Sequence, residues 1–148
     1  MTDKLADLYR KPGHLLRRAQ QVIVGTFTRE CAEYDLTPVQ YAALTAIRFY
    51  PGTDATRLAE MIAFDRSTIG NVLIRLEKKG LIRRDTHESD KRIKTVSLTS
   101  TGLNLVIRAD PIVDQVQEKF LAPLTKQEAA EFIRLLHKLA DVREITRD

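Results

Sequence analysis

The sequence predicts a mainly α-helical protein with one small β-hairpin, and three observations lead to this fold class. Apolar residues recur at three- and four-residue spacing through most of the chain, which is the period of an amphipathic helix. Two short segments, residues 81–85 and 93–98, alternate instead, as half-buried strands do. Two short helical patterns run directly into these strands from residue 54 onward. This order favours a helix-turn-helix followed by a hairpin, which is a winged helix-turn-helix.

The first two expected helices lie before residue 53. The segment 14–33 follows Pro12-Gly13 and has a wide apolar stripe. The stripe consists of Leu15, Leu16, Ala19, Val22, Ile23 and Phe27. Thr37-Pro38 predicts the start of the second helix, because a proline at the first helical position lacks only an N–H that would have no helical partner. Pro51-Gly52 predicts its end.

Two shorter helices follow, and each begins after an aspartate that can cap its first turn. Asp54 is the expected N-cap of one helix. Asp65 is the expected N-cap of the other, which ends at Gly80. Their apolar positions are Leu58, Met61 and Ile62 in the first, and Ile69, Val72, Leu73 and Leu76 in the second. The turn-forming residues Glu88, Ser89 and Asp90 then join the two strands.

The last third of the chain predicts two longer helices. Thr99 is the expected N-cap of the first, and Pro111 is expected to kink it. Its apolar residues are Leu105, Ile107, Ile112, Val113, Val116 and Phe120. Thr125 and Glu128 have the spacing of a capping box that opens the second helix. This last helix carries Phe132, Leu135, Leu136, Leu139 and Val142 on one side.

The terminal helices have more apolar surface than local partners can cover, because a winged helix of about 65 residues can fold alone. Packing against a second copy of the chain in a two-fold dimer is the simplest way to bury them, and folding back within a monomer is the alternative. We therefore expect one domain over residues 1–148, with a winged helix-turn-helix at 36–102. Residues 8–34 and 103–147 are the expected dimerisation helices.

Length and composition exclude several classes of protein. A chain of 148 residues that is 30% charged and 43% hydrophobic fits one folded domain. No apolar run approaches the roughly 18 residues of a membrane span. The first seven residues lack the pattern of a secretory signal, so we expect a cytoplasmic protein. No Gly-rich phosphate loop, nucleophile elbow or HExxH motif is present, so we expect neither an enzyme nor a cofactor.

The basic residues are concentrated in one part of the chain. Residues 66–94 contain nine lysines and arginines against four acidic residues, whereas the whole chain has a net charge of only +4. The basic residues are Arg66, Arg75, Lys78, Lys79, Arg83, Arg84, Lys91, Arg92 and Lys94. A basic region on an otherwise balanced protein is typical of phosphate binding, although a solvated charged face has the same composition.

Four fragments resemble the multiple antibiotic resistance regulator (MarR) family. They are Leu36-Thr-Pro-Val-Gln-Tyr41, Leu76-Glu-Lys-Lys-Gly-Leu-Ile82, Asp90-Lys-Arg92 and Leu98-Thr-Ser-Thr-Gly102. Each fragment is weak alone, but their order and spacing are specific, and the resemblance covers nearly the whole chain. It implies a homodimeric winged helix-turn-helix repressor that binds a pseudo-palindromic operator in double-stranded DNA.

The resemblance also implies a set of residues on the recognition helix that contact DNA. These are Arg66, Ser67, Thr68, Asn71 and Arg75. Hydroxyl, amide and guanidinium groups can pair with base edges or phosphates. We expect Ser67, Thr68 and Asn71 at bases and Arg75 at a phosphate or a guanine. Ser67 could equally serve only to start the helix.

Four residues of the wing complete the expected DNA contacts. Arg92 corresponds to the wing-tip arginine that the family inserts into the minor groove, where a narrow A·T-rich groove concentrates negative potential. Asp90 corresponds to the acidic residue that orients the wing by pairing with an arginine, and it is also an ordinary turn residue. Lys91 and Lys94 are expected at phosphates rather than bases.

The resemblance extends to an effector. Family members commonly release DNA when an aromatic acid or a related small molecule binds, and residues 12–21 resemble the members that control aromatic-acid catabolism. An arginine among apolar residues, here Arg17 or Arg18, can bind the carboxylate of such an acid or a phosphate of its coenzyme A thioester. An inter-subunit salt bridge is the alternative role. His14 and Tyr41 could add orienting hydrogen bonds.

Three other functions are weighed against this one. A winged helix that only contacts proteins needs no basic wing, yet Arg83, Arg84, Lys91 and Arg92 are present. Peroxide-sensing members have their reactive cysteine near the start of the first helix. Cys31, the single cysteine, lies near its end and is expected to be a buried inert thiol. His14, His87 and His137 show no metal-ligand spacing, so we expect no metal site.

Overall fold

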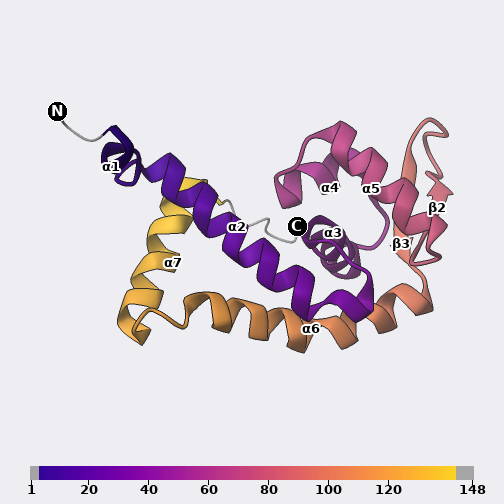
Figure 1. The fold of residues 1–148 in the computed structure, drawn as a ribbon. Coiled ribbons are helices and arrows are strands. Elements are labelled where there is room, and N and C mark those ends of the chain that lie inside the picture. The colour runs from indigo at the N-terminus through magenta and orange to yellow at the C-terminus, as the bar shows by residue number, and fades with distance from the viewer. Residues whose placement is uncertain (1–3, 143–148) are drawn as a thin grey trace. The chain divides into compact units, whose positions relative to one another are not determined.

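The computed structural model describes residues 4–142, which are mostly helical with one small three-stranded antiparallel sheet, as predicted (Figure 1). Their contacts divide the chain into two compact units. The central unit is Tyr34–Pro111, and the terminal unit combines Met1–Glu33 with Ile112–Asp148. No helix in the described range is long and apolar enough to cross a membrane.

Most elements of the central unit match the predicted order. It contains α3 (Pro38–Phe49), β1 (Thr53–Asp54), α4 (Ala55–Ile62), α5 (Arg66–Lys78), β2 (Ile82–Thr86), β3 (Lys94–Leu98) and the first turns of α6 (Ser100–Leu121). The terminal unit contains α1 (Lys4–Leu8), α2 (Pro12–Glu30), the rest of α6 and α7 (Lys126–Ala140). A 3-10 turn, η1 (Ala32–Tyr34), spans the boundary between the two units in sequence. The predicted helix over 14–33 therefore begins two residues earlier, with Pro12 in its first turn, and ends before Cys31.

The helix starts are fixed by side-chain caps. Asp54 accepts a hydrogen bond from the Arg57 N–H at 2.9 Å, and Asp65 accepts one from the Thr68 N–H at 2.8 Å, so both predicted aspartate caps are confirmed. A complete capping box is present at Thr37, whose side chain and backbone both bond to Gln40.

The capping box predicted at Thr125 is formed only in one direction. Thr125 Oγ1 accepts from the Glu128 N–H at 3.2 Å, whereas no returning bond from the Glu128 side chain is found among the described residues. At the start of α6, the side chain of Thr99 caps the first turn, because its Oγ1 accepts a hydrogen bond from the Gly102 N–H at 3.1 Å. Thr99 is therefore the N-cap that the sequence predicts.

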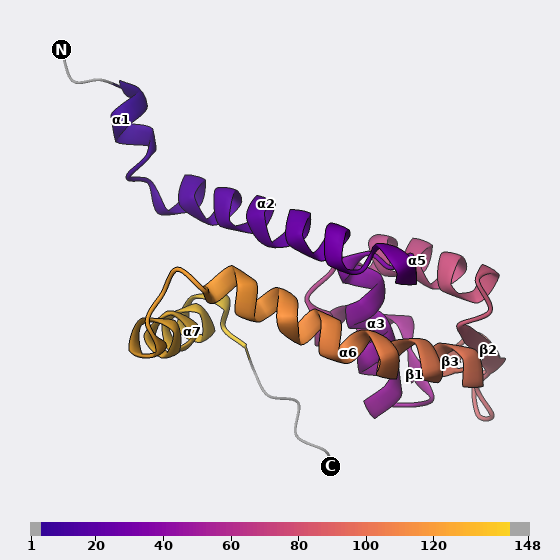
Figure 2. The ribbon, with the colours of Figure 1, turned by 60° about the horizontal axis from the view of Figure 1, so that its bottom comes forward.

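The sheet joins the wing to the helices. Its strand order is β1–β3–β2, and the three strands are labelled in Figure 2. Thr53 lies opposite Val96, and Ile82 lies opposite Leu98, in antiparallel pairs. The Gly52 N–H also donates to the Val96 carbonyl oxygen at 2.9 Å. The sequence does not predict β1, because two residues are too few to show alternation. The central strand β3 is thus bonded on both sides, once to the start of α4 and once to β2.

The core of the central unit collects one face of each helix and one face of the sheet. Fully buried side chains include Leu44, Ile47, Leu58, Ile69, Leu73, Leu76, Val96 and Val106. Met61 and Ile62, expected to be buried, are only partly buried at the edge of this cluster. Val106 and Ala109 of α6 belong to the same core, which explains why the unit extends to Pro111. The central unit thus includes nine residues beyond the segment 36–102 that is expected to bind DNA.

The start of α6 lies against the residue that precedes β2. A Cβ atom on Gly102 would lie 1.9 Å from the Leu81 carbonyl oxygen and 2.8 Å from the Leu81 carbonyl carbon. The Thr99 N–H donates to the same Leu81 oxygen at 3.1 Å, and Thr99 Oγ1 donates to the Gly80 oxygen at 2.6 Å. Only a residue without a side chain fits at position 102. Further along, α6 continues through Pro111 as one helix.

Much of the apolar stripe of α2 is exposed. Leu15, Leu16 and Val22 remain 47%, 48% and 58% exposed, while Phe27 near the end of the helix is buried. Exposed apolar residues also occur on α7, at Ile133, Leu135 and Leu139. Of the expected dimerisation segments, residues 143–147 lie outside the described residues.

Candidate nucleic-acid interface

Helix α5 has a buried face and an outward face of different chemistry. Its core side consists of Ile69, Val72, Leu73 and Leu76. At 3.6 residues per turn, the opposite side of the helix carries Ser67, Asn71, Ile74 and Lys78, all of which are exposed. Three of these four are polar. The helix therefore presents hydrogen-bonding groups along a surface that the central unit leaves open.

Thr68, one of the residues predicted to contact bases, forms hydrogen bonds within the first turn of α5. The Thr68 hydroxyl donates to Asp65 Oδ1 at 2.5 Å, and the Thr68 N–H donates to Oδ2 at 2.8 Å. These two bonds lower the pKa of Asp65 below its ordinary value. Thr68 is half-buried, and its hydroxyl proton is committed to the helix cap, whereas Ser67 and Asn71 face outward.

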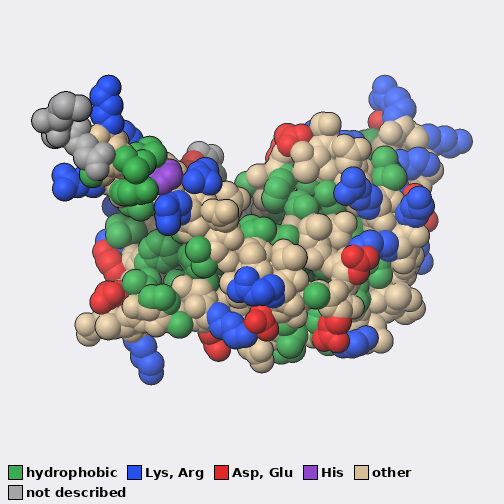
Figure 3. All heavy atoms as spheres, viewed as in Figure 1, with side chains coloured by type: hydrophobic (Ala, Val, Ile, Leu, Met, Phe, Trp, Pro, Cys, Tyr) green, Lys and Arg blue, Asp and Glu red, His purple; other side chains and the backbone are tan. Residues whose placement is uncertain are grey.

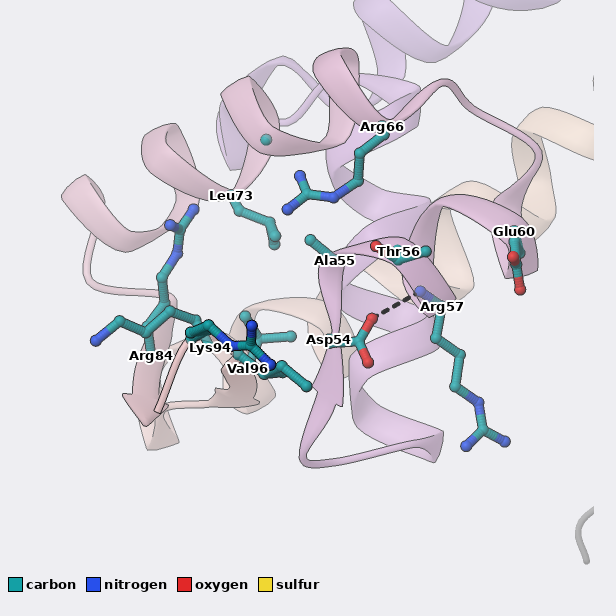
Figure 4. A pocket seen from close by; sticks show the side chains of 13 residues that line it. Asp54, Ala55, Thr56, Arg57, Glu60, Arg66, Leu73, Arg84, Lys94 and Val96 are labelled. Carbon is teal, nitrogen blue, oxygen red and sulfur yellow. Dashed lines mark hydrogen bonds between the residues drawn. The ribbon is translucent and has the colours of Figure 1, made fainter. Parts of the chain in front are cut away.

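A basic cleft of about 570 Å³ lies between α4, α5 and the sheet (Figure 4). Arg66 of α5, Arg84 of β2 and Arg92 and Lys94 of the wing line it, together with Arg57 of α4. Its acidic lining residues are Asp54 and Glu60, and Leu73 and Val96 supply apolar surface. Asp54 already caps α4. The cleft thus has an excess of positive charge at the junction of recognition helix and wing, which suits a phosphate.

A second, smaller cleft of about 260 Å³ lies on the other side of α5. Thr68, Asn71 and Arg75 line it from α5, and Thr37, Val39 and Gln40 line it from the start of α3. The predicted DNA contacts of α5 are therefore divided between two sides of one helix. Arg66 belongs to the basic cleft, and Asn71 and Arg75 belong to the smaller one.

The wing tip is held by Asp90. Asp90 Oδ1 accepts from the Arg92 backbone N–H at 3.0 Å and from Nε at 3.1 Å, and Oδ2 accepts from Nη2 at 3.1 Å. The Arg92 side chain is nevertheless 90% exposed. Lys91 is also exposed, and Lys94 Nζ donates to Thr86 Oγ1 at 3.1 Å. Lysine and arginine side chains gather over this end of the face drawn in Figure 3.

The charge of Asp90 is constant around neutral pH. The hydrogen bond from the Arg92 side chain, followed by that from its backbone N–H, lowers the pKa of Asp90 from its ordinary value of 3.8. A carboxyl group with a lowered pKa contributes its pairing energy above the ordinary value, and the contribution is lost as the pH falls through the lowered value. The Asp90–Arg92 pair is therefore intact at every pH above about 4.

Two cleft residues are not among the predicted DNA contacts. Arg84 was predicted only as part of the basic wing, although its position two residues after the buried Ile82 places both on the same side of the strand. Arg57 lies in the first turn of α4, where its backbone N–H bonds to the cap. Only the fold brings these two arginines to one cleft.

The predicted effector residues fall into different units. In the terminal unit, the rings of His14 and Tyr9 lie 5.9 Å apart, and the Arg18 guanidinium lies 5.8 Å from the Tyr9 ring. His14 Nε2 is buried and has no hydrogen-bond partner among the described residues. Tyr9, Leu15 and Arg18 line a hollow of about 300 Å³. Arg17 is exposed on the same helix.

Tyr41 belongs to a different cluster in the central unit. Its hydroxyl donates to Asp110 Oδ1 at 2.7 Å, and Arg48 Nη1 donates to Asp110 Oδ2 at 2.9 Å. This network joins α3 to α6. The Tyr41 hydroxyl is therefore part of a structural contact.

Cys31 is 1% exposed. Burial, with a smaller contribution from the negative charge of Glu30, raises the pKa of the thiol. A raised pKa leaves less thiolate at neutral pH, and the thiolate is the reactive form. The structure agrees with the expected buried thiol.

We expect native Cys31 to react with a thiol reagent such as Ellman's reagent at pH 8 at least about tenfold more slowly than the urea-unfolded chain. Absorbance at 412 nm follows both reactions, and the unfolded protein is the control for a chemically intact thiol. Equal rates in the two states would contradict the burial.

The sequence and the fold of this chain are similar to those of known transcriptional regulators. The model of the MarR family matches residues 36–94. The transcriptional regulator HosA of Escherichia coli O157:H7 is 36% identical over 132 residues, which cover 89% of this chain and 96% of HosA. Among solved structures, Bordetella bronchiseptica BpsR, whose DNA binding is regulated by 6-hydroxynicotinic acid, matches with a TM-score of 0.86 and 29% identity over 90% of this chain and 96% of BpsR. The transcriptional repressor CouR bound to a 23-mer DNA duplex matches with a TM-score of 0.84 and 26% identity over 95% of this chain and 97% of CouR.

Proposed function

Because the chain belongs to the MarR family of transcriptional regulators, we propose that it is a homodimeric repressor released from a pseudo-palindromic operator by a small aromatic acid or its coenzyme A thioester. One observation carries the DNA-binding part of this proposal. The outward face of α5, the basic cleft and the wing-tip arginine all belong to the central unit, and β3 links the wing to the start of α4.

Each copy of the protein would place α5 in a major groove. Ser67 and Asn71 on its outward face are suited to base edges, and Arg66 and Arg75 on its two sides are suited to phosphates or a guanine. Arg92 at the wing tip is suited to the adjacent minor groove. Two copies related by a two-fold axis would read half-sites about one helical turn apart.

The terminal helices are the proposed dimerisation surface. Their exposed leucines, isoleucines and valines on α2 and α7 are the large apolar side chains that a second copy would cover. The DNA-reading segment would extend from about residue 36 to Pro111, since α6 shares the core of the central unit up to that point.

An aromatic carboxylate is the proposed effector. In the terminal unit, Arg18 and the ring of His14 both lie near the Tyr9 ring, and His14 Nε2 has no hydrogen-bond partner among the described residues. This supports the proposed class, because a guanidinium binds a carboxylate and a ring nitrogen can bind a second polar group. The regulation of BpsR by 6-hydroxynicotinic acid supports the same class. Tyr41 is a weaker candidate because its hydroxyl bonds to Asp110.

Selection of tight-binding duplexes from a randomised DNA library tests the proposed function. We expect a pseudo-palindromic sequence to be enriched, and its affinity to fall steeply between 50 and 200 mM salt, by about 10³-fold or more if each dimer neutralises six phosphates. Benzoates, hydroxycinnamates and their coenzyme A thioesters are then screened by thermal shift and by operator release. A monomer that enriches no sequence at low salt would contradict the proposal, and it would favour a winged helix that contacts only proteins.

Replacing Asn71 by alanine should reduce discrimination between the operator and random DNA. An amide that makes a bidentate contact with adenine contributes about 1–3 kcal/mol to the choice of base. Asn71 is exposed, and alanine favours helix, so the fold should be unaffected. Fluorescence anisotropy on both duplexes at fixed salt measures the ratio. An equal loss on the two duplexes would make Asn71 a backbone contact.

A further inference from the structure

Ile74 is an apolar residue in the middle of the outward face of α5. Its side chain is 57% exposed. It belongs neither to the core of the central unit nor to the partly buried residues packed against that core. Its neighbours on the same face are the polar residues Ser67, Asn71 and Lys78. No described part of the chain covers it, although burying an aliphatic side chain away from water is energetically favourable.

Gly70 makes the surface beside Ile74 unusually bare. Side chains on a helix lean towards its N-terminus, so Ile74 leans over the turn that contains Gly70 and Asn71. Gly70 has no side chain there, and a Cβ atom at that position would already lie 3.4 Å from Arg66 Nη1. The exposed Ile74 side chain and the bare Gly70 backbone thus form one small patch of surface, called the notch below, with the Arg66 guanidinium on its Gly70 side.

We propose that this notch receives the 5-methyl group of a thymine in the major groove, so that Ile74 selects thymine at one position of each half-site. The inference rests on the proposed function and adds a residue that determines specificity. A methyl group is the only apolar feature that a base pair presents in the major groove, and cytosine and the purines lack it there. The adjacent Asn71 and Ser67 could bond to the polar edge of the neighbouring base pair.

Charge around the notch favours DNA over a protein as the occupant. Arg75 and Lys78 are neighbours of Ile74 on α5, together with Glu77, which pairs with Arg84 at 4.0 Å. Arg66, Arg92 and Lys94 line the basic cleft. The centre of a protein–protein interface is depleted of charged residues, whereas a protein–DNA interface is strongly positive. An isolated isoleucine within a basic polar surface therefore fits a duplex.

The test exchanges thymine for uracil, which differs only by the absence of the methyl group. An operator selected from the randomised library is resynthesised with deoxyuridine at each thymine in turn, and the affinity of the full-length protein is measured at fixed salt. At one position of the half-site, we expect uracil to lower the affinity by about fourfold per half-site. This factor corresponds to the free energy of burying one methyl group. For Ile74→Ala that difference between thymine and uracil should disappear, while Ile74→Val should retain most of it.

Lys78→Ala is the matched control, because it changes an exposed residue on the same face. It should weaken the thymine and uracil duplexes by the same factor and leave their ratio unchanged. Thermal unfolding should show that Ile74→Ala is folded, since alanine is the better helix former. An uracil scan with no affected position, or an affected position whose ratio is the same in Ile74→Ala, would overturn the inference while leaving the proposed function intact. Failure to select any operator would instead contradict the proposed function.

Discussion

Gly102→Ala is expected to lower the free energy of unfolding by about 3 kcal/mol or more. The added methyl carbon would lie 1.9 Å from the Leu81 carbonyl oxygen, and the obstacle is backbone, which cannot rotate away as a side chain can. Moving the first turn of α6 to relieve the clash would stretch the two hydrogen bonds that Thr99 makes to Gly80 and Leu81. Urea denaturation followed by circular dichroism measures the change.

Gly13→Ala is the matched control for this experiment. Gly13 also lies in the first turn of a helix, but a Cβ atom there would have nothing within 4 Å. The substitution should be neutral or stabilising by up to about 1 kcal/mol, because alanine favours helix and restricts the unfolded chain. Similar free energies of unfolding for the two variants would show that the approach of α6 to Leu81 is less close than described.

Arg92→Ala is expected to weaken operator binding by about 2 kcal/mol for each wing, and so by roughly 1,000-fold for a dimer that engages both. A guanidinium in a narrow minor groove interacts with concentrated negative potential, and alanine removes that interaction. The Arg92 side chain is 90% exposed, so the dimer should persist, which light scattering can establish. Gel-shift titration at fixed salt gives the affinity.

Two variants separate the groove contact from loss of charge. Arg83→Ala removes one positive charge from the exposed side of β2, where Arg83 pairs with Asp85 at 3.3 Å outside the basic cleft. It should cost much less affinity than Arg92→Ala. Arg92→Lys keeps the charge but loses the planar fork, and should bind with intermediate affinity. Unchanged affinity in Arg92→Ala would remove the wing from DNA recognition.

Most of the longer helices and the aspartate-capped helix starts could be predicted because their causes are local, whereas the five-residue α1 was not predicted. An aspartate before an apolar period caps the helix that follows it, and Asp54 and Asp65 do so in the structure. The two-residue strand β1 depends on its partner Val96, which lies more than forty residues away in sequence. The extension of the central unit along α6 likewise depends on which core Val106 and Ala109 join. Neither relation leaves a periodic trace in the sequence.

The candidate site shows the same division between local and long-range causes. Asn71, Arg75 and Arg92 could be assigned to DNA binding because the family resemblance places them on the recognition helix and the wing, and their side chains can form hydrogen bonds. Ile74 lies outside the apolar stripe of Ile69, Val72, Leu73 and Leu76, but its spacing alone suggests no role, and the structure adds that it is 57% exposed. The family motif that ends at Gly102 was visible in the sequence, but its physical reason, the backbone of Leu81, was not.

The position of β3 between two bonded neighbours has a consequence for regulation. A wing attached only to its own hairpin partner could bend by itself, but this one shares its middle strand with the entrance to α4. The helix α4 and the wing should therefore move together as one rigid unit. The duplex repeats every turn, about 34 Å, so a dimer binds two half-sites only when its two recognition helices are separated by about this distance. A ligand would then release the DNA by changing the distance between the two central units of a dimer, without unfolding either unit.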